Sequence, residues 1–169
     1  SGRVAHDGQG LEAQLRSFGS AAEAVMCDMS DPTSVLHLCN HGMLCGVLHA
    51  AGLLRDKVVR STAAFGMSEV FTPKALASSY IRSAVAQKPL AAFGLFSSAA
   101  AALGNVGQGN YATANAYLDA LAITCRQHGT TGSALQIPAV RGAGMGASLF
   151  DTEQLDAMGA VSLSEFAEC

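Results

Sequence analysis

Short apolar segments alternate along the chain with longer segments whose apolar residues recur at helical spacing. Apolar runs of four to eight residues predict buried strands, and apolar positions three and four residues apart predict helices. The strand-like segments are AEAVMCDM (22–29), GVLHAAG (46–52), LAAFGLFSS (90–98) and SALQI (133–137). The helix-like segments are 11–19, a stretch that begins at Pro32, 74–87 and 110–129.

The ends of these helices carry local signals. Asp31 precedes Pro32, and a capping residue followed by proline in the first turn is typical of a helix start. Gly19 and Gly129 follow their apolar segments and predict helix stops. The sequence after Phe150 predicts a helix, a turn and the start of a second helix.

This alternation predicts an α/β fold. Strands that are apolar on both faces and separated by helices are typical of a parallel sheet with helices on each side. The crossovers are expected to be right-handed. No repeat, linker or low-complexity tract divides the 169 residues, so we expect one Rossmann-like domain.

Charge and composition narrow the function classes. The net charge is −3 and no cluster of Lys and Arg exists, so we expect no nucleic-acid partner. The most apolar stretch, 90–104, is shorter than the roughly 20 residues that a membrane helix needs. The odd cysteine count is typical of reduced thiols, which predicts an intracellular, by default cytoplasmic, protein. A targeting segment upstream of Ser1 stays an open alternative.

One expected element of a dinucleotide-binding fold is missing from the sequence. Such folds open with a strand, a glycine-rich turn and a helix that holds the pyrophosphate. No G-x-G-x-x-G occurs near the start, where residues 1–10 resemble the loop after a second strand. GAGMG (142–146) lies late and is not followed by a convincing helix. We therefore expect the first strand–turn–helix unit and the second strand to be absent.

Several polar residues suit carbonyl chemistry. Ser98 ends an apolar strand, Tyr111 follows thirteen residues later, and Asn115 follows four after that. Residues four apart lie on one face of a helix, so the phenol and the carboxamide can act together. A nearby cation such as Lys74 helps a phenol to release its proton.

The segments around these residues resemble the ketoreductase domain of polyketide synthases, within the short-chain dehydrogenase/reductase superfamily. The resemblance covers about residues 1 to 146, and it predicts a partial ketoreductase domain over 1–150 with a C-terminal tail of the same domain over 151–169. The matching segments are CDMSD (27–31), GVLHAAG (46–52), FTPKALAS (71–78) and GNVGQGNYATANAYLDALA (104–122).

The resemblance implies an NADPH-dependent reduction of a carrier-bound β-ketoacyl group to a β-hydroxyacyl group. Ser98 would bond the substrate carbonyl, Tyr111 would donate the proton, Lys74 would support the tyrosine and the cofactor ribose, and Asn115 would complete the polar relay. The implied cofactor-binding positions are Arg3, Asp28, Ala50, Ala51, Gly52, Lys74 and Tyr111.

The resemblance also implies a stereochemical outcome. Family members that give the D-alcohol, called B-type, carry Leu-Asp-Asp where this chain has Leu54-Arg55-Asp56, so the second and more telling Asp is present. The opposite type carries a tryptophan at the position of Leu103. Thr113 replaces the proline of the subtype that reduces epimerised substrates. We expect a B-type enzyme.

The implied partners are an acyl carrier protein bearing the β-ketoacyl chain and the other domains of a synthase. Two alternatives stay open: a ketoreductase of a fatty acid synthase, and a non-catalytic fragment that binds no cofactor. Because the glycine-rich turn is missing, we expect residues 1–169 alone to bind NADPH weakly or not at all.

A His/Cys group lies on or near one helix but faces different directions, so no metal is expected: His37, Cys39, His41 and Cys45.

Overall fold

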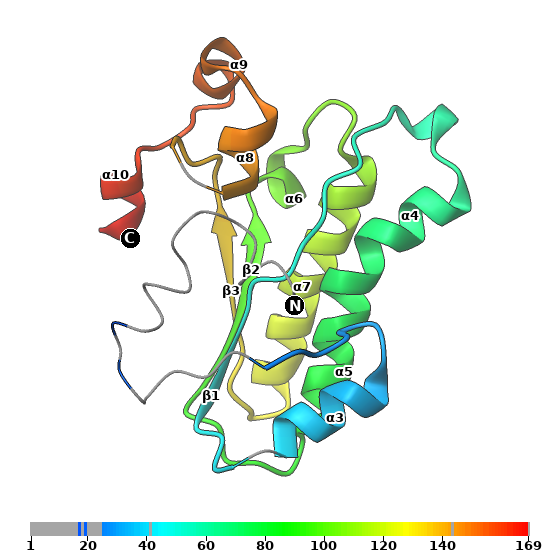
Figure 1. Cartoon of the computed structure of the whole chain (residues 1–169), viewed down its shortest axis with the longest axis vertical. Helices are drawn as coiled ribbons and strands as arrows, with labels where there is room; N and C mark the ends of the chain where they lie inside the picture. The colour runs from blue at the N-terminus through cyan, green and yellow to red at the C-terminus, as the bar shows by residue number, and fades with distance from the viewer. Residues whose placement is uncertain (1–16, 18, 20–24, 41, 143, 169) are drawn as a thin grey trace.

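A computed structural model describes residues 17, 19, 25–40, 42–142 and 144–168. Within them, three parallel strands form one sheet in the order β1 (Gly46–His49), β2 (Ala92–Ser98) and β3 (Ser133–Ile137). Gly46 pairs with Ala92, and Gly94 pairs with Ser133. The sheet confirms the predicted Rossmann-like architecture, and its strands run side by side through the molecule (Figure 1).

Three of the four predicted strands form where expected. β3 has the predicted bounds, and β1 and β2 lie within their apolar segments. The strand predicted over 22–29 is wrong for its described part, because Val25–Asp28 is irregular and a turn follows. Asp28 Oδ1 accepts hydrogen bonds from the backbone N–H and the hydroxyl of Ser30, and such local bonds favour a turn.

Two of the predicted helices are confirmed. Helix α3 (Pro32–Asn40) starts at the expected proline, and Asp31 accepts bonds from the backbone of Thr33 and Ser34. Helix α7 (Gly109–Gln127) is followed by Gly129 at a φ of 70°, a left-handed conformation that suits glycine. The predicted helix 11–19 falls almost entirely outside the described residues.

The helix predicted over 74–87 begins earlier than expected. Helix α4 (Ala64–Phe71), a π-helical turn (Thr72–Leu76) and α5 (Ala77–Ala84) follow one another without a break. Pro73 therefore lies inside a helical run and not at its start. Proline lacks a backbone N–H, and its ring collides with the carbonyl four residues earlier in an α-helix. The wider π turn accommodates the ring at this point.

Short elements complete the chain. Residues 163–167 confirm the second helix start predicted after Phe150, and both terminal helices begin with capping boxes, at Asp151 and Ser162. A helix also starts within GAGMG, so the expectation that none would follow it is wrong. The short elements of the described chain are η2 (Val59–Ser61), α6 (Ala100–Leu103), α8 (Gly144–Leu149), α9 (Thr152–Ala157) and α10 (Leu163–Ala167).

The main core joins helices to one face of the sheet. Phe93 and Leu95 alternate along β2 and point to this face, where they are almost fully buried. Helical cover of the opposite face stays a prediction. The core residues are Val35, Cys39, Ile81, Val85, Phe93, Leu95, Leu118, Ala122 and Cys125.

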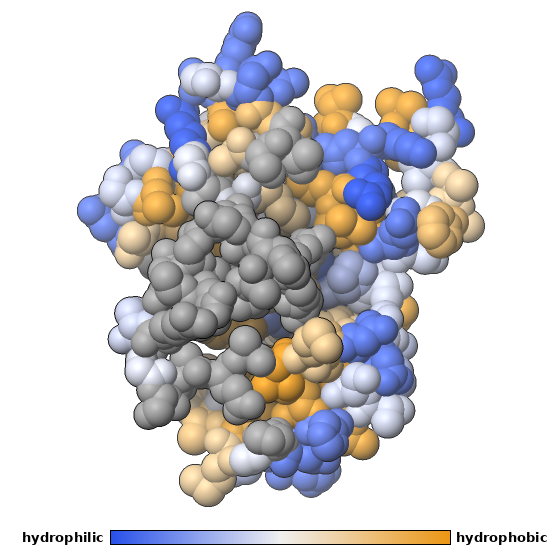
Figure 2. Space-filling view, viewed as in Figure 1, coloured by the Kyte–Doolittle hydropathy of each residue, from blue (hydrophilic) through white to orange (hydrophobic). Residues whose placement is uncertain are grey.

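The surface retains apolar side chains near β1 and α3. Met43 is 95% exposed and Leu48 is 72% exposed. Hydrophobic surface is visible towards this lower end of the molecule (Figure 2). Two of the cysteines, Cys39 and Cys125, are core residues, whereas Cys45 is exposed. Among the described residues, no helix is long and apolar enough to cross a membrane.

Candidate active site

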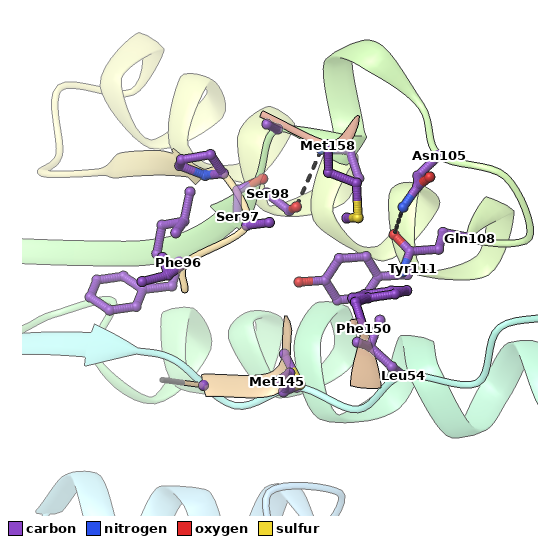
Figure 3. A pocket seen from close by; sticks show the side chains of 18 of the residues that line it. Leu54, Phe96, Ser97, Ser98, Asn105, Gln108, Tyr111, Met145, Phe150 and Met158 are labelled. Carbon is purple, nitrogen blue, oxygen red and sulfur yellow. Dashed lines mark hydrogen bonds between the residues drawn. The ribbon is translucent and has the colours of Figure 1, made fainter. Parts of the chain in front are cut away.

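A cavity of about 880 Å³ lies at the carboxyl ends of the strands. In open α/β sheets this edge is where ligands bind. Ser98 reaches it from the end of β2, Tyr111 from the first turns of α7, and Lys74 from the π turn. Figure 3 shows the phenol of Tyr111 pointing into the cavity towards the end of β2. Three of the four predicted catalytic residues therefore share one cavity.

Ser98 is oriented by the chain that follows it. Its Oγ accepts a hydrogen bond of 3.2 Å from the backbone N–H of Ala100, at the start of α6. A hydroxyl that accepts in this way still has its own hydrogen to donate. Ser97 differs, because its buried hydroxyl donates to the backbone oxygen of Asn115. Of the serine pair, Ser98 has the hydroxyl that suits a substrate carbonyl.

Lys74 places an ammonium group beside Tyr111. Its side chain is 3% exposed, and Nζ donates a 2.8 Å hydrogen bond to the Phe96 carbonyl. Nζ also lies 5.6 Å from the centroid of the Tyr111 ring, within cation–π range. Burial lowers the pKa of Lys74 to about 8. The group therefore stays mostly charged at neutral pH, and an ammonium has donors beyond the one bonded to Phe96.

A hydrogen bond holds the backbone of Lys74, and its side chain lies against a glycine. His49 is buried at the end of β1, and burial lowers its pKa, so its neutral ring donates from Nε2 to the Lys74 carbonyl at 3.1 Å. His49 is thus a packed, hydrogen-bonded histidine. A Cβ on Gly52 would lie 2.9 Å from Cε of Lys74. A glycine at position 52 therefore gives the lysine side chain its room.

Asn115 lies behind the cavity and does not line it. Its side chain is fully buried, and Nδ2 donates to the Tyr111 carbonyl at 2.8 Å. The asparagine lies one helical turn after the tyrosine, as the spacing predicts, and the bond orients its carboxamide. Its Oδ1 has no hydrogen-bond partner among the described residues. A buried amide oxygen of this kind is a natural acceptor for a water molecule.

The predicted cofactor positions divide into three groups. Ala50, Ala51 and Gly52 follow β1 and line the cavity beside Lys74 and Tyr111. Asp28 is exposed and does not line the cavity, and its hydrogen bonds to Ser30 lower the pKa of its carboxyl. Arg3 lies outside the described residues.

Asp56, the predicted stereochemical residue, also does not line the cavity. Its Oδ2 accepts a 2.9 Å hydrogen bond from Nε2 of Gln108, and Gln108 lines the wall in its place. Sequence reasoning assigned Gln108 no role of its own. The signal was its place in the matched motif, three residues before Tyr111.

The C-terminal segment forms a wall that the sequence did not reveal. Met145, Phe150, Met158 and Leu163 contribute apolar surface to the cavity. Met158 and Phe150 line the same cavity as Ser98 and Tyr111 (Figure 3). Backbone bonds between Val161 and residues 139 and 141 attach this segment beyond the end of β3. The apolar wall can shield a reacting carbonyl from water.

The His/Cys group does not converge in its described part. Cys39 belongs to the buried core and Cys45 is exposed, while His41 lies outside the described residues. Among the described residues, no three His, Cys, Asp or Glu side chains come together as metal ligands would.

Comparisons with known proteins identify relatives of this chain. A family model described as "KR domain" matches residues 1–142. Polyketide synthase GfsA of Streptomyces halstedii is 41% identical over 129 residues, which are 74% of this chain and 2% of that protein. The spectinabilin polyketide synthase system protein NorB of Streptomyces orinoci is 40% identical over 152 residues, which are 86% of this chain and 7% of that protein. The chain thus spans a small part of these relatives.

Solved structures show the same fold. A ketoreductase domain from the bacillaene assembly line has a TM-score of 0.85 and 28% identity, over 96% of this chain and 42% of that chain. A structure titled as A-type ketoreductases from a modular polyketide synthase has a TM-score of 0.81 and 31% identity, over 92% of this chain and 35% of that chain.

We expect Lys74 to lose its proton near pH 8, because burial disfavours its charged form. Competitive labelling with trace acetic anhydride, followed by mass spectrometry of the Lys74 peptide, measures this midpoint in the natural protein. A short lysine peptide in the same tube is the control and should titrate near the ordinary value of about 10.4. A Lys74 midpoint equal to that of the control would contradict the buried setting.

Proposed function

The chain belongs to the ketoreductase (KR) domains of polyketide synthases, with the short-chain dehydrogenase/reductase fold, and we propose that it reduces a carrier-bound β-ketoacyl group with NADPH. The product is the β-hydroxyacyl group. The observation that carries the proposal is the shared cavity of Ser98, Tyr111 and the buried ammonium of Lys74. The polyketide synthase relatives favour this pathway over the fatty acid pathway.

The cavity suits the nicotinamide half of the cofactor together with an acyl chain. The Ala50–Gly52 turn has small side chains, which leave room for a flat ring. The Lys74 ammonium and the Tyr111 phenol would bond the ribose hydroxyls. Asp28 and Arg3 would hold the adenine side and the 2′-phosphate. NADPH, when bound, supplies the hydride that the carbonyl carbon accepts.

The protein residues supply the proton and orient the carbonyl. Ser98 donates a hydrogen bond to the carbonyl oxygen, and Tyr111 transfers its phenolic proton to the same oxygen as general acid. Lys74 stabilises the phenolate that remains, because opposite charges attract strongly in a site that excludes water. Asn115 completes the relay through its unpartnered Oδ1, which can accept a hydrogen bond from a water molecule.

The proposed partners follow from the substrate. A β-ketoacyl chain on an acyl carrier protein would enter between the 54–57 segment and the apolar wall of the C-terminal segment, which we propose to be part of the same domain. The other synthase domains would supply the keto group and process the alcohol. An intracellular location stays a prediction.

Replacement of Tyr111 by phenylalanine should remove most turnover in the natural protein. A general acid contributes roughly two to four orders of magnitude, and Tyr111→Phe deletes only the acidic hydroxyl. NADPH oxidation with a β-ketoacyl thioester is the assay. Tyr117→Phe is the matched control, because it removes a phenol on the same helix that bonds Ser79 outside the cavity. Equal activity of the two variants would refute the assignment of the acid.

The alcohol should have the D configuration. Asp56 is present, Leu103 stands where the opposite type has tryptophan, and Thr113 replaces the proline of the epimerised-substrate subtype. Chiral chromatography of the β-hydroxyacyl product from the natural protein decides the configuration. Predominantly L-configured alcohol would show that Arg55 reverses the signature.

A further inference from the structure

Asp56 and the cavity are separated by one side chain. The carboxylate lies outside the cavity lining, and the Gln108 side chain between them is 3% exposed. Both ends of the Gln108 amide are bonded: Nε2 donates to Asp56 Oδ2 at 2.9 Å, and Oε1 accepts from Asn105 Nδ2 at 3.1 Å. Figure 3 shows the Asn105–Gln108 bond beside Tyr111. The orientation of the glutamine amide is therefore fixed from two sides.

Two further hydrogen bonds join the same pair of segments. The backbone N–H of Lys57 donates to the Gly107 carbonyl at 2.8 Å. Asn110, which is 5% exposed, donates from Nδ2 to the Arg55 carbonyl at 2.9 Å, and its Oδ1 accepts from the Tyr111 backbone N–H at 2.8 Å. The 54–57 segment is thus bonded to the start of the helix that carries the acid.

These bonds also place an apolar side chain next to the acid. Leu54 packs against the small cluster formed by Val70, Tyr111 and Ala114, and it lines the cavity. Leu54 therefore borders the space beside the phenol in which a ketone chain would lie. A 54–57 segment that is held by several hydrogen bonds keeps Leu54 in place. A loosened segment would let the ketone chain bind in either orientation.

We propose that Asp56 is a positioning residue that acts through Gln108 and does not touch the substrate. Its carboxylate holds the Gln108 amide in the cavity wall and the 54–57 segment against α7, and this fixes the face of the carbonyl that meets the hydride. The inference rests on the proposed function and deepens it, because it gives the stereochemical aspartate a physical role.

The chemistry of the bond predicts what its loss does. A hydrogen bond from an amide to a carboxylate is stronger than one between neutral groups. Without Asp56 the Nε2 donor of a buried Gln108 has lost its partner, and an unsatisfied buried donor is costly enough to make the side chain turn elsewhere. Gln108 lines the cavity, so the cavity is open to a side chain that turns away from position 56. An asparagine at position 56 retains an acceptor oxygen and so retains the bond.

The test is a double-mutant cycle in the natural full-length protein. The variants are Asp56→Ala, Asp56→Asn, Gln108→Ala and the double variant Asp56→Ala/Gln108→Ala. The D:L ratio of the alcohol, kcat and KM are measured with a β-ketoacyl thioester. Two variants that act through one bond are non-additive.

We expect Asp56→Ala and Gln108→Ala each to lower the D:L ratio by about tenfold, the double variant to lower it no further, and Asp56→Asn to stay within about twofold of the natural protein. Most of the effect should appear in the product ratio and KM, because the proton donor is intact. Additive losses would overturn the proposal. A loss in Asp56→Asn equal to that in Asp56→Ala would do the same, since the negative charge would then act by itself.

Hydrogen-exchange mass spectrometry tests the bond without any turnover. Asp56→Ala should speed exchange in the peptides that cover 54–60 and 104–110, Asp56→Asn should not, and a peptide over β3 is the internal control. Unchanged exchange in Asp56→Ala would refute the positioning role even if the enzyme is active. If the natural protein reduces no β-ketoacyl thioester but shows the expected exchange pattern, the proposed function is refuted. The hydrogen bonds that attach the 54–57 segment to Gln108 and α7 would then still be established.

Discussion

The site is organised around the buried ammonium of Lys74. A charge this far from water is costly unless its surroundings compensate, and the compensation comes from the Phe96 carbonyl and the face of Tyr111. The π turn around Pro73 gives the lysine backbone its direction, and His49 holds that backbone through a carbonyl. Sheet, helix and turn therefore meet at one cation.

Hydrogen bonds between irregular segments extend this geometry to the cavity wall. The 54–57 segment has no regular structure of its own, yet Gln108 and Asn110 attach it to the first turns of α7. The C-terminal segment closes the other side with apolar residues and is attached beyond β3 by its own backbone bonds. The cavity thus has a polar end at Lys74 and Tyr111 and an apolar side formed by the C-terminal segment.

The sequence predicted the elements whose signals are local. Apolar runs located β1, β2 and β3, and Gly129 marked the end of α7. The sequence pattern placed the start of the helix at Lys74, too late in the chain, because a proline usually opens a helix. The π turn around Pro73 depends on tertiary packing, which the local sequence does not reveal.

The candidate site was predictable only in part for a similar reason. Ser98 and Tyr111 were found through their spacing in a motif, and the structure brings them to one cavity with Lys74. The intermediary role of Gln108 and the wall formed by Met158 and Phe150 depend on long-range contacts that no spacing encodes.

The pH dependence of turnover links the charge on Lys74 to the chemistry. Burial places the pKa of Lys74 at about 8, so the group is charged below that pH and neutral above it. The natural protein should lose β-ketoacyl reduction as the pH rises through 8, whereas Lys74→Met should be slow at every pH and show no such step. A Lys74→Met variant with the natural rate, or with the same step near pH 8, would show that the charge on Lys74 does not support the reduction.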